Sequence, residues 1–298
     1  MQVHLHVQNQ APRTWQALSA GWWTGHVYAE DHWLSLKEID AALLGIQSAA
    51  DLADLLNQWN GHFALLWSKG QLHLAATDIS RSIPVFWQVD SGVVNLSDYP
   101  ILSPVTANVW QASKVLVHSE FIPGHATLWF GWQQLQAGEI LEVKGGLCYL
   151  HNYFPHRRPS SPQRSTQQWE EGFQQVLENI IDRLISFAAG RTIVIPLSGG
   201  YDSRILLAAL HKKKYPKLKA FTYGLAGSTE VQIAQKVAEE LKVEWRFVSY
   251  EEALIGQFGD QEWSAYATFA SKGSGLHQEQ DYFALLSLKK QTWLQDDH

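Results

Sequence analysis

The stretch Ile193-Val-Ile-Pro-Leu-Ser-Gly-Gly-Tyr-Asp-Ser-Arg-Ile-Leu-Leu-Ala-Ala-Leu210 joins an apolar run to a helical run through a turn with two adjacent glycines. The run Ile193–Leu197 predicts a buried strand, and the apolar spacing from Arg204 onward predicts a helix. The turn Ser198–Ser203 is therefore expected at the carboxyl end of a strand and the start of a helix, where α/β sheets bind their ligands.

The same alternation continues along the chain. Strand, helix, strand, helix and strand are expected in turn over Thr192–Leu197, Asp202–Lys213, Leu218–Tyr223, Thr229–Leu241 and Val243–Ser249. Buried strands separated by helices are typical of βαβ units, so this half is predicted to be an α/β domain, doubly wound, with a parallel sheet. Ahead of it, apolar residues at helical spacing from Trp169 to Ile185 predict a long helix with one packed face.

The turn has the chemistry of a phosphate-binding loop. Gly199 and Gly200 let backbone N–H groups approach a phosphate, and Ser198 and Ser203 add hydroxyl donors beside the positive end of a helix. Asp202 would repel a bare phosphate, which makes it a candidate ligand of a Mg²⁺ ion that bridges phosphate oxygens. The alternative is a glycine-rich turn whose Asp and Ser only cap the helix.

Two common nucleotide motifs are missing from this turn. It has neither the Gly-Lys-Ser/Thr of a Walker A loop nor the G-x-G-x-x-G of a dinucleotide site. The string Ser198-Gly-Gly-Tyr-Asp-Ser203 instead resembles the PP-loop of N-type ATP pyrophosphatases, which cleave ATP between its α and β phosphates. This resemblance implies an adenine nucleotide alpha hydrolase-like fold for the second half.

The resemblance extends beyond the loop to the synthetase domain of asparagine synthetases. It is carried by Phe221-Thr-Tyr-Gly224, by Ser228-Thr-Glu-Val-Gln-Ile-Ala-Gln-Lys-Val-Ala238 and by Arg246-Phe-Val-Ser249. It implies ATP and Mg²⁺ as cofactors, with Asp202 on the metal and the adenine framed by main chain. The implied nucleotide-binding residues are Leu197, Ser198, Gly199, Gly200, Asp202, Ser203, Tyr223 and Gly224.

The first half has a different sequence pattern, in which short predicted strands are separated by turn residues. Lys69-Gly70 joins two apolar runs as in a hairpin, and helices are expected near Ser35–Leu43 and Ala49–Trp59. This α+β half resembles the class II glutamine amidotransferase half of asparagine synthetases, which implies an Ntn-hydrolase-like sandwich. The matching strings are Leu56–Ala64, Leu74–Phe86, Leu96–Asp98, Phe121–Leu128 and Leu135–Glu139.

The expected domains are residues 1–155, amidotransferase-like, and 167–298, of the synthetase type, joined by a Pro-rich polar linker at 156–166. The chain departs from the family at both ends. Gln2 stands where family members have a catalytic N-terminal cysteine, and Cys148 lies inside the predicted strand Leu147–Leu150. We therefore expect no glutamine hydrolysis, and a scaffolding or docking role for the first domain.

The end of the chain has helical patterns near Glu251–Gly256, Glu262–Ser271 and Gln280–Lys290. It lacks the second Ser-Gly-Glu/Asp-Gly loop and the catalytic Lys with which the family continues. The synthetase domain is accordingly expected to be incomplete, through truncation or because a second chain supplies the remainder.

Bulk composition narrows the class of protein. The chain has 298 residues, a formal charge of −6, a single cysteine and 46% hydrophobic residues. These values predict a folded cytoplasmic protein with no disulfide, no membrane segment and no general attraction to nucleic acid. Composition does not decide whether the protein has a partner chain or forms a homo-oligomer.

Three minor groups of residues have two interpretations each. His4 and His6 either bind a metal ion together or are ordinary strand residues. Lys212–Lys214 is a binding patch or a favourable helix end. His277, Glu279 and Asp281 approach the nucleotide or line the start of a helix.

The leading hypothesis is an ATP-dependent amide ligase. A substrate carboxylate would attack the α-phosphate of ATP, and ammonia or an amine would displace AMP from the acyl-adenylate. Tyr201 and Arg204 differ from the usual loop residues of asparagine synthetases, so the acceptor need not be aspartate, and a sugar carboxylate is one possibility. The alternative is a catalytically silent ATP-binding or scaffolding subunit. A tRNA-modifying or NAD-synthesising enzyme is a weaker third hypothesis.

Overall fold

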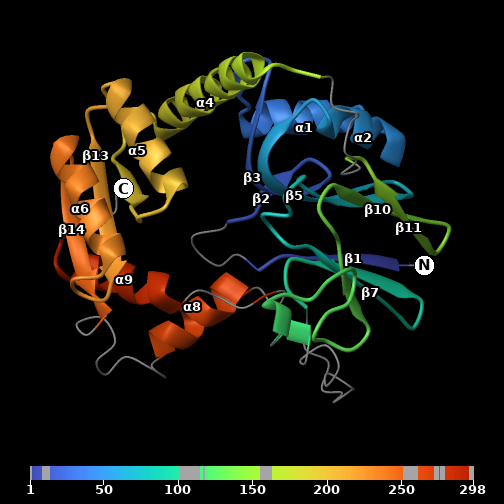
Figure 1. Cartoon of the computed structure of the whole chain (residues 1–298). Helices are drawn as coiled ribbons and strands as arrows, with labels where there is room; N and C mark the ends of the chain where they lie inside the picture. Colours follow the sequence, from blue (N-terminus) through green and yellow to red (C-terminus); the bar gives the residue numbers. More distant parts are fainter. Residues whose placement is uncertain are drawn as a thin grey trace. The chain divides into compact units, whose positions relative to one another are not determined.

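The computed structural model describes residues 2–8, 14–100, 115–116, 118–154, 163–250, 261–271, 275 and 279–294. The chain divides into two compact units, Met1–Arg157 with Thr268–His277, and Arg158–Ala267 with Gln278–His298 (Figure 1). The first division falls inside the expected linker, of which residues 155–162 lie outside the described residues. The segment from Thr268 was expected in the second domain but groups with the first unit, in which Gly275 bridges to Phe121.

The larger sheet of the first unit has the strand order β11-β10-β6-β5-β3-β2, with β4 paired to β3, and all its pairs are antiparallel. The expected hairpin is confirmed, because β5 and β6 meet at Gly70, whose φ of 62° suits glycine. The strands are β2 (Gln16–Leu18), β3 (Gly21–Ala29), β4 (His32–Trp33), β5 (Asn60–Lys69), β6 (Leu72–Thr77), β10 (Glu139–Lys144) and β11 (Leu147–Asn152).

The smaller sheet of this unit has the order β1-β8-β7-β9. Its strand β1 runs parallel to β8, whereas β7 is antiparallel to both of its neighbours. The strands are β1 (Gln2–His6), β7 (Phe86–Asp90), β8 (Val93–Ser97) and β9 (Trp132–Gln134).

Strand β5 separates two hydrophobic cores, because its side chains alternate between the two faces of the sheet. Phe63 and Leu65 point to one core, which also contains buried residues of the helices α1 (Leu36–Leu44) and α2 (Ala49–Leu56). Leu66 points to the other core, shared with the smaller sheet. The first unit is thus a layer of helices on two packed sheets, and its α+β character is confirmed.

Both helices of this layer begin at a serine cap. Ser35 and Glu38 form a capping box at α1, and Ser48 accepts a hydrogen bond from the Asp51 amide at α2. The second helix ends at Leu56, earlier than the expected Trp59, because the chain turns through Asn57 into strand β5.

The second unit contains the expected alternation of strands and helices. Its three strands β12, β13 and β14 are parallel and lie in that order, so the predicted parallel sheet is confirmed. Its helices at the end of the chain agree with two of the three expected ones; the third, at 251–256, lies outside the described residues. The elements are α4 (Thr166–Ala188), β12 (Ile193–Pro196), α5 (Tyr201–Lys212), β13 (Leu218–Gly224), α6 (Thr229–Glu240), β14 (Glu244–Ser249), α8 (Gln261–Ser271, of which the residues from Thr268 belong to the first unit) and α9 (Glu279–Lys290).

Helices cover both faces of this sheet. Ile195 and Ala220 face a core formed with α4, α5 and α6, whereas Phe221 and Val248 face a core formed with α9. The unit therefore has three layers. A reversal of strand order, the mark of a doubly wound sheet, is not found among the described strands.

The apolar face of α4 is only partly buried, so the prediction of one packed face is wrong for several of its residues up to Ile180. Ile181 and Ala188 are buried in the core, but Trp169, Phe173 and Ile180 are exposed. The physical reason is length. Helix α4 has 23 residues and α5, against which it packs, has 12, or about 34 Å against about 18 Å at the rise of an α-helix.

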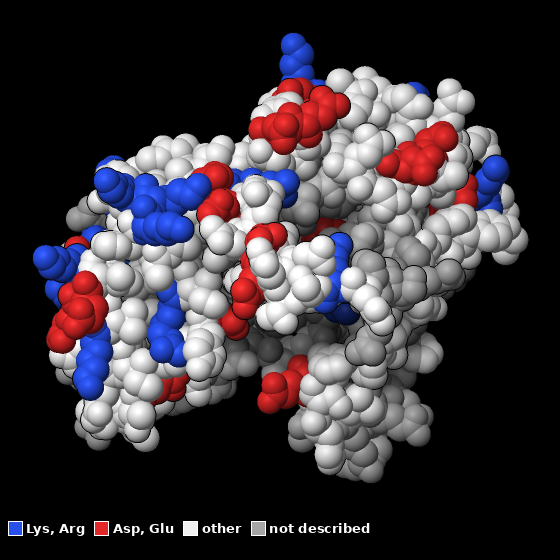
Figure 2. All heavy atoms as spheres, turned by 45° about the horizontal axis from the view of Figure 1, so that its top comes forward, with Lys and Arg blue, Asp and Glu red and all other residues white. Residues whose placement is uncertain are grey.

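Charged side chains of both signs are mixed on the surface. On the face in Figure 2, Lys and Arg lie among Asp and Glu instead of forming a continuous area of one sign. The expected position of the lysines at a helix end agrees with the structure, because Lys212 lies in the last turn of α5 and Lys213 is its C-cap. Lys213 Nζ also lies 2.6 Å from Asp182 Oδ1 of α4. None of the helices in the described part of the chain combines the length and apolarity needed to cross a bilayer.

Candidate functional site

A cavity of about 260 Å³ lies at the carboxyl end of strands β12 and β13, beside the glycine-rich loop. Leu197, one of its lining residues, is held by two main-chain hydrogen bonds: its N–H donates to Phe221 O at 2.7 Å, and its carbonyl accepts from Thr222 Oγ1 at 2.7 Å. The cavity is lined by Pro196, Leu197, Ser198, Phe221, Thr222, Tyr223, Glu230, Tyr250 and Gln280.

The loop is closed by hydrogen bonds between its own residues. Ser198 N–H donates to Ser203 Oγ at 3.0 Å, and the two hydroxyl oxygens are 3.1 Å apart. Gly200 N–H donates to Ser198 Oγ at 3.1 Å. Both hydroxyls are thus held on one side of the loop, in the compact turn that a phosphate-binding loop requires.

The paired glycines are needed for packing at this loop. A Cβ at Gly199 would lie 3.3 Å from the Cα of Glu230, at the start of α6, and one at Gly200 would lie 3.2 Å from Ser198 Oγ. Both distances are tighter than ordinary van der Waals contact. The loop therefore lies directly against α6, and larger residues would displace it.

Helix α5 begins without a side-chain cap. Its N-cap is Gly200, which has no side chain to bond the first amides, so these N–H donors face the loop without a capping group. Asp202 is exposed in the first turn. The adjacent Tyr201 is 77% exposed, and the guanidinium of Arg204 lies 4.7 Å from the centre of its ring.

Tyr223 and Tyr250 form the aromatic side of the cavity, with ring centres 6.1 Å apart. The hydroxyl of Tyr223 donates to Asp281 Oδ1 of α9. Burial, and then this bond to Asp281, raise the pKa of Tyr223 well above its usual range. The phenol is therefore a neutral hydrogen-bond donor at physiological pH.

The structure brings together some of the residues expected from the sequence. Leu197, Ser198 and Tyr223 line the cavity, and Ser203 is bonded to Ser198. Gly199, Gly200 and Asp202 lie in the adjoining loop and first helical turn, but not in the cavity wall. Gly224 ends β13 with a φ of 151°, a conformation that side chains rarely adopt.

Sequence reasoning missed Thr222, Glu230, Tyr250 and Gln280 as cavity residues. Ligands of parallel sheets bind beyond the carboxyl ends of the strands. Because α6 starts just after the end of β13, this rule could have predicted Glu230 as a cavity residue. Asp281 lies in the first turn of α9, as the helix-start interpretation expects, and its carboxylate accepts a hydrogen bond from the cavity residue Tyr223. Its approach to a nucleotide stays a prediction. His277 lies outside the described residues, as does the side chain of Glu279.

Among the described residues, no group of three or more His, Cys, Asp or Glu side chains could hold a metal ion. A cation at the loop would therefore be bound by Asp202 and by oxygens of the substrate. That set suits Mg²⁺, which commonly binds one or two carboxylates together with substrate phosphates and water.

Residues 173–270, which contain the loop, the parallel sheet and α6, match the family model for asparagine synthase. This part of the chain is similar to asparagine synthase. The match supports, at the level of the family, an ATP-binding amide ligase. The match does not reach Met1–Arg157, which make up most of the first unit.

Comparison with curated proteins gave no match. Among solved structures, glutamine phosphoribosylpyrophosphate amidotransferase from B. subtilis, complexed with ADP and GMP, is similar at 11% identity and a TM-score of 0.29. The alignment covers 83% of this chain and 75% of that chain. A TM-score of this size adds nothing to the assignment of either unit.

Proposed function

We propose that the second unit is the nucleotide-binding part of an asparagine synthetase-type ligase. It would activate a small-molecule carboxylate as its adenylate, release pyrophosphate, and pass the acyl group to ammonia or an amine. The observation that carries this proposal is the self-bonded Ser198–Ser203 loop at an uncapped helix start, within the segment that matches asparagine synthase.

The loop residues would divide the binding of MgATP between them. The amides after Gly200 and the hydroxyls of Ser198 and Ser203 would donate to phosphate oxygens, and Asp202 would hold Mg²⁺. The ion would supply charge neutralisation for the leaving pyrophosphate. These donors and Asp202 all belong to the loop or the first turn of α5, so one rigid element would hold the reacting phosphates.

The adenine base would lie in the adjoining cavity. The main chain at Leu197 and at Tyr223-Gly224 would frame it, and the aromatic rings of Tyr223 and Tyr250 line the same cavity. A flat aromatic base is well suited to such walls, because ring contacts add to the area that it buries.

For the first unit we infer an Ntn-hydrolase-like sandwich without glutaminase activity. Its two packed sheets with a helical layer support the fold. Cys148 lies on strand β11, and burial raises the pKa of its thiol, which keeps it in the unreactive protonated form. Nitrogen would thus come from free ammonia or from an amine.

A second candidate function is a silent ATP-binding subunit that works only with another chain. The observation that favours it is the composition of the cavity wall, which includes no Lys or Arg among its described residues. Adenylation benefits from such a cation, because negative charge builds up on the departing pyrophosphate.

The deciding experiment measures pyrophosphate release from ATP with a panel of carboxylic acids and ammonia. The ligase predicts release that depends on one class of acid and is lost in Asp202→Asn. Asp182→Asn is the matched control, since it makes the same change at an exposed residue of α4. ATP binding without turnover for any acid would establish the silent subunit instead.

A further inference from the structure

Glu230 lines the cavity of the second unit, and neither the phosphate contacts nor the adenine walls proposed above use it. It lies in the first turn of α6, just beyond the carboxyl end of β13. Among the described residues, its carboxylate has no hydrogen-bond or ion-pair partner. The helix dipole favours an acid at this position, but it does not account for a carboxylate in the wall of a nucleotide cavity, where it would repel phosphates.

The main chain of Glu230 packs directly against the proposed phosphate-binding loop. A Cβ added to Gly199 would lie 3.3 Å from the Cα of Glu230 and 3.4 Å from its Cγ. The amides that follow Gly200 at the start of α5 are the proposed phosphate donors. The side chain of Glu230 therefore begins beside the end of the site that would hold the triphosphate.

The carboxylate of Glu230 is also close enough to the two tyrosines of the cavity to affect them. Burial, and then the charge of Glu230, raise the pKa of Tyr250. Burial and Asp281 have the larger effects on the pKa of Tyr223, and Glu230 raises it further. The carboxylate thus lies near the aromatic side of the cavity as well as near the loop.

This position between the loop and the tyrosines corresponds to the sugar of a nucleotide. The ribose of ATP joins the triphosphate to the adenine, so phosphates at the loop and a base at Tyr223 and Tyr250 would leave the ribose beside Glu230. Ribose carries adjacent hydroxyl groups on C2′ and C3′, and an ionised carboxylate has two acceptor oxygens. In dinucleotide-binding folds an acidic residue accepts the ribose 2′-hydroxyl in the same manner.

We propose that Glu230 recognises the ribose of the nucleotide by accepting hydrogen bonds from its 2′- and 3′-hydroxyls, which makes the site selective for ribonucleotides over deoxyribonucleotides. This assignment rests on the proposed function of the second unit. Hydrogen bonds to an ionised acceptor are stronger than those between neutral groups, so each hydroxyl contributes to selectivity. A phosphate on either oxygen would be repelled, so the ligand class is a nucleoside 5′-triphosphate with both hydroxyls free.

The exocyclic amino group of adenine is the other donor of ATP that a carboxylate can accept. It lies at the end of the molecule farthest from the phosphates, whereas Glu230 packs against Gly199 of the loop. The contact with the loop therefore favours the ribose. Inosine triphosphate, which has an oxygen in place of this amino group, distinguishes the two assignments.

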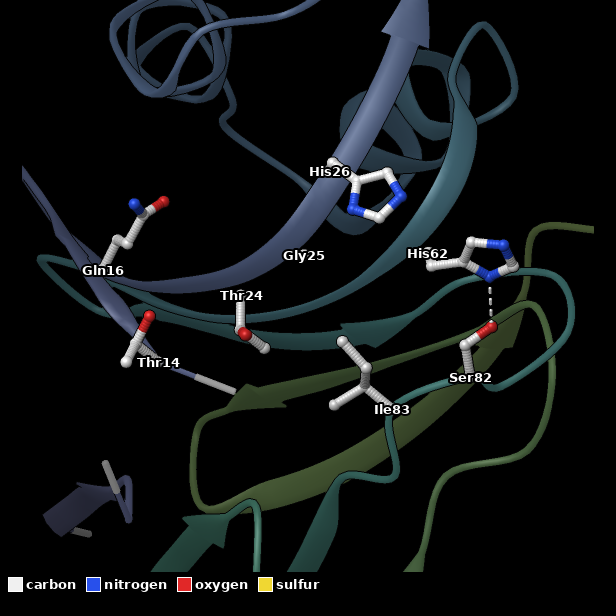
Figure 3. A pocket seen from close by; sticks show the side chains of 8 residues that line it. All are labelled: Thr14, Gln16, Thr24, Gly25, His26, His62, Ser82 and Ile83. Atoms are coloured by element: carbon white, nitrogen blue, oxygen red, sulfur yellow. Dashed lines mark hydrogen bonds between the residues drawn. The ribbon is translucent and has the colours of Figure 1, made fainter. Parts of the chain in front are cut away.

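The larger cavity of the first unit, of about 420 Å³, has no comparable group (Figure 3). It lies beside His26 and His62, which are cross-strand partners on β3 and β5. Figure 3 shows His62 bonded to Ser82, with Nδ1 and Oγ 2.6 Å apart. Its described lining residues include no Asp or Glu, so selectivity for a ribose is expected of the second-unit cavity and not of this one.

The test is calorimetric titration of the full chain with the Mg²⁺ complexes of ATP, 2′-deoxyATP, 3′-deoxyATP and inosine triphosphate. Wild type should bind each deoxynucleotide about 10- to 100-fold more weakly than ATP, the loss expected for a hydrogen bond to a charged group. Glu230→Gln should remove most of this discrimination, because its amide offers a single neutral acceptor oxygen. Glu240→Gln makes the same change at the other end of α6 and should keep the wild-type ratio of affinities.

The ratio of affinities separates ribose recognition from a structural effect, because a variant that only disturbs the loop weakens all the nucleotides alike. Circular dichroism checks that each variant is folded. Equal affinities of wild type for ATP and both deoxynucleotides, or a wild-type ratio in Glu230→Gln, would overturn the role of Glu230 and leave the ATP site intact. Discrimination against inosine triphosphate that Glu230→Gln removes would assign the carboxylate to the adenine instead. Failure of every nucleotide to bind would contradict the proposed function itself.

Discussion

The hydroxyl of Tyr223 at the end of β13 donates a hydrogen bond to Asp281 of α9, which lies 58 positions further along the chain. This bond connects the wall of the proposed nucleotide cavity to the helix that covers the opposite face of the sheet from α5 and α6. The shape of the cavity therefore depends on the docking of α9 as well as on the loop.

Tyr223→Phe should destabilise the second unit by about 1 kcal/mol, because it removes one net hydrogen bond and keeps the ring. Urea unfolding followed by fluorescence measures the change. Tyr201→Phe is the control, since that ring is largely exposed, and it should leave the midpoint unchanged. Equal midpoints for Tyr223→Phe and wild type would mean that the bond contributes nothing.

Thr222→Val should cost about 2–4 kcal/mol, because it removes the hydroxyl that bonds two other groups. That hydroxyl donates to Leu197 O at 2.7 Å and accepts from Trp245 Nε1 at 2.9 Å. Thr222→Ser keeps both bonds and should lose much less. A Thr222→Val midpoint equal to that of wild type would mean that the two hydrogen bonds of the hydroxyl contribute nothing.

Gly199→Ala should weaken ATP binding at least 10-fold, because the new Cβ presses on the backbone of Glu230 and moves the loop. Fluorescence or calorimetric titration with MgATP measures the affinity. Gly172→Ala is the control, since no atom lies within 4 Å of its added Cβ, and as a helix-interior change it should raise stability by about 0.5–1 kcal/mol. If Gly199→Ala leaves the affinity for ATP unchanged, the loop does not bind the nucleotide.

Acid should release the N-terminal cap of α1. Bonds from the side chain and then the backbone of Ser35, followed by His32, lower the pKa of Glu38 from 4.5 to about 2. Since the folded-state pKa is below the unfolded value, this stabilisation is present above pH 4.5 and is lost as the pH falls through about 2.

Titration by NMR tests this cap directly. The Ser35 amide signal should shift with a midpoint near pH 2, where the carboxylate of Glu38 takes up its proton. Glu38→Gln should remove the shift, because its side chain does not titrate. A midpoint at the ordinary value of 4.5 would contradict the capping box.

Local sequence was sufficient to predict the elements around the loop. The glycine pair, the apolar run before it and the helical spacing after it lie within a few residues of one another, and the hairpin at Gly70 follows from the same kind of local signal. The apolar stripe of α4 was equally clear from Trp169 to Ile185. What covers that stripe depends on the lengths of other helices, which is why half of it is exposed.

The cavity walls could not be predicted in the same way. Tyr250 and Gln280 reach the second-unit cavity from segments distant in the sequence, and Asp281 bonds its residue Tyr223. His26 and His62 are opposed only because β3 and β5 pair in one particular register, although two helices separate them in the chain. Register between non-consecutive elements is set by burial of the whole sheet, which no local pattern specifies.

The most direct test of the proposed ligase identifies the bond of ATP that is cleaved. Phosphorus NMR of the full chain with MgATP, ammonia and a panel of carboxylic acids distinguishes the two possible product pairs. The account predicts AMP and pyrophosphate with wild type, and neither product with Asp202→Asn. The appearance of ADP and inorganic phosphate, or ATP that stays intact with every acid, would contradict it.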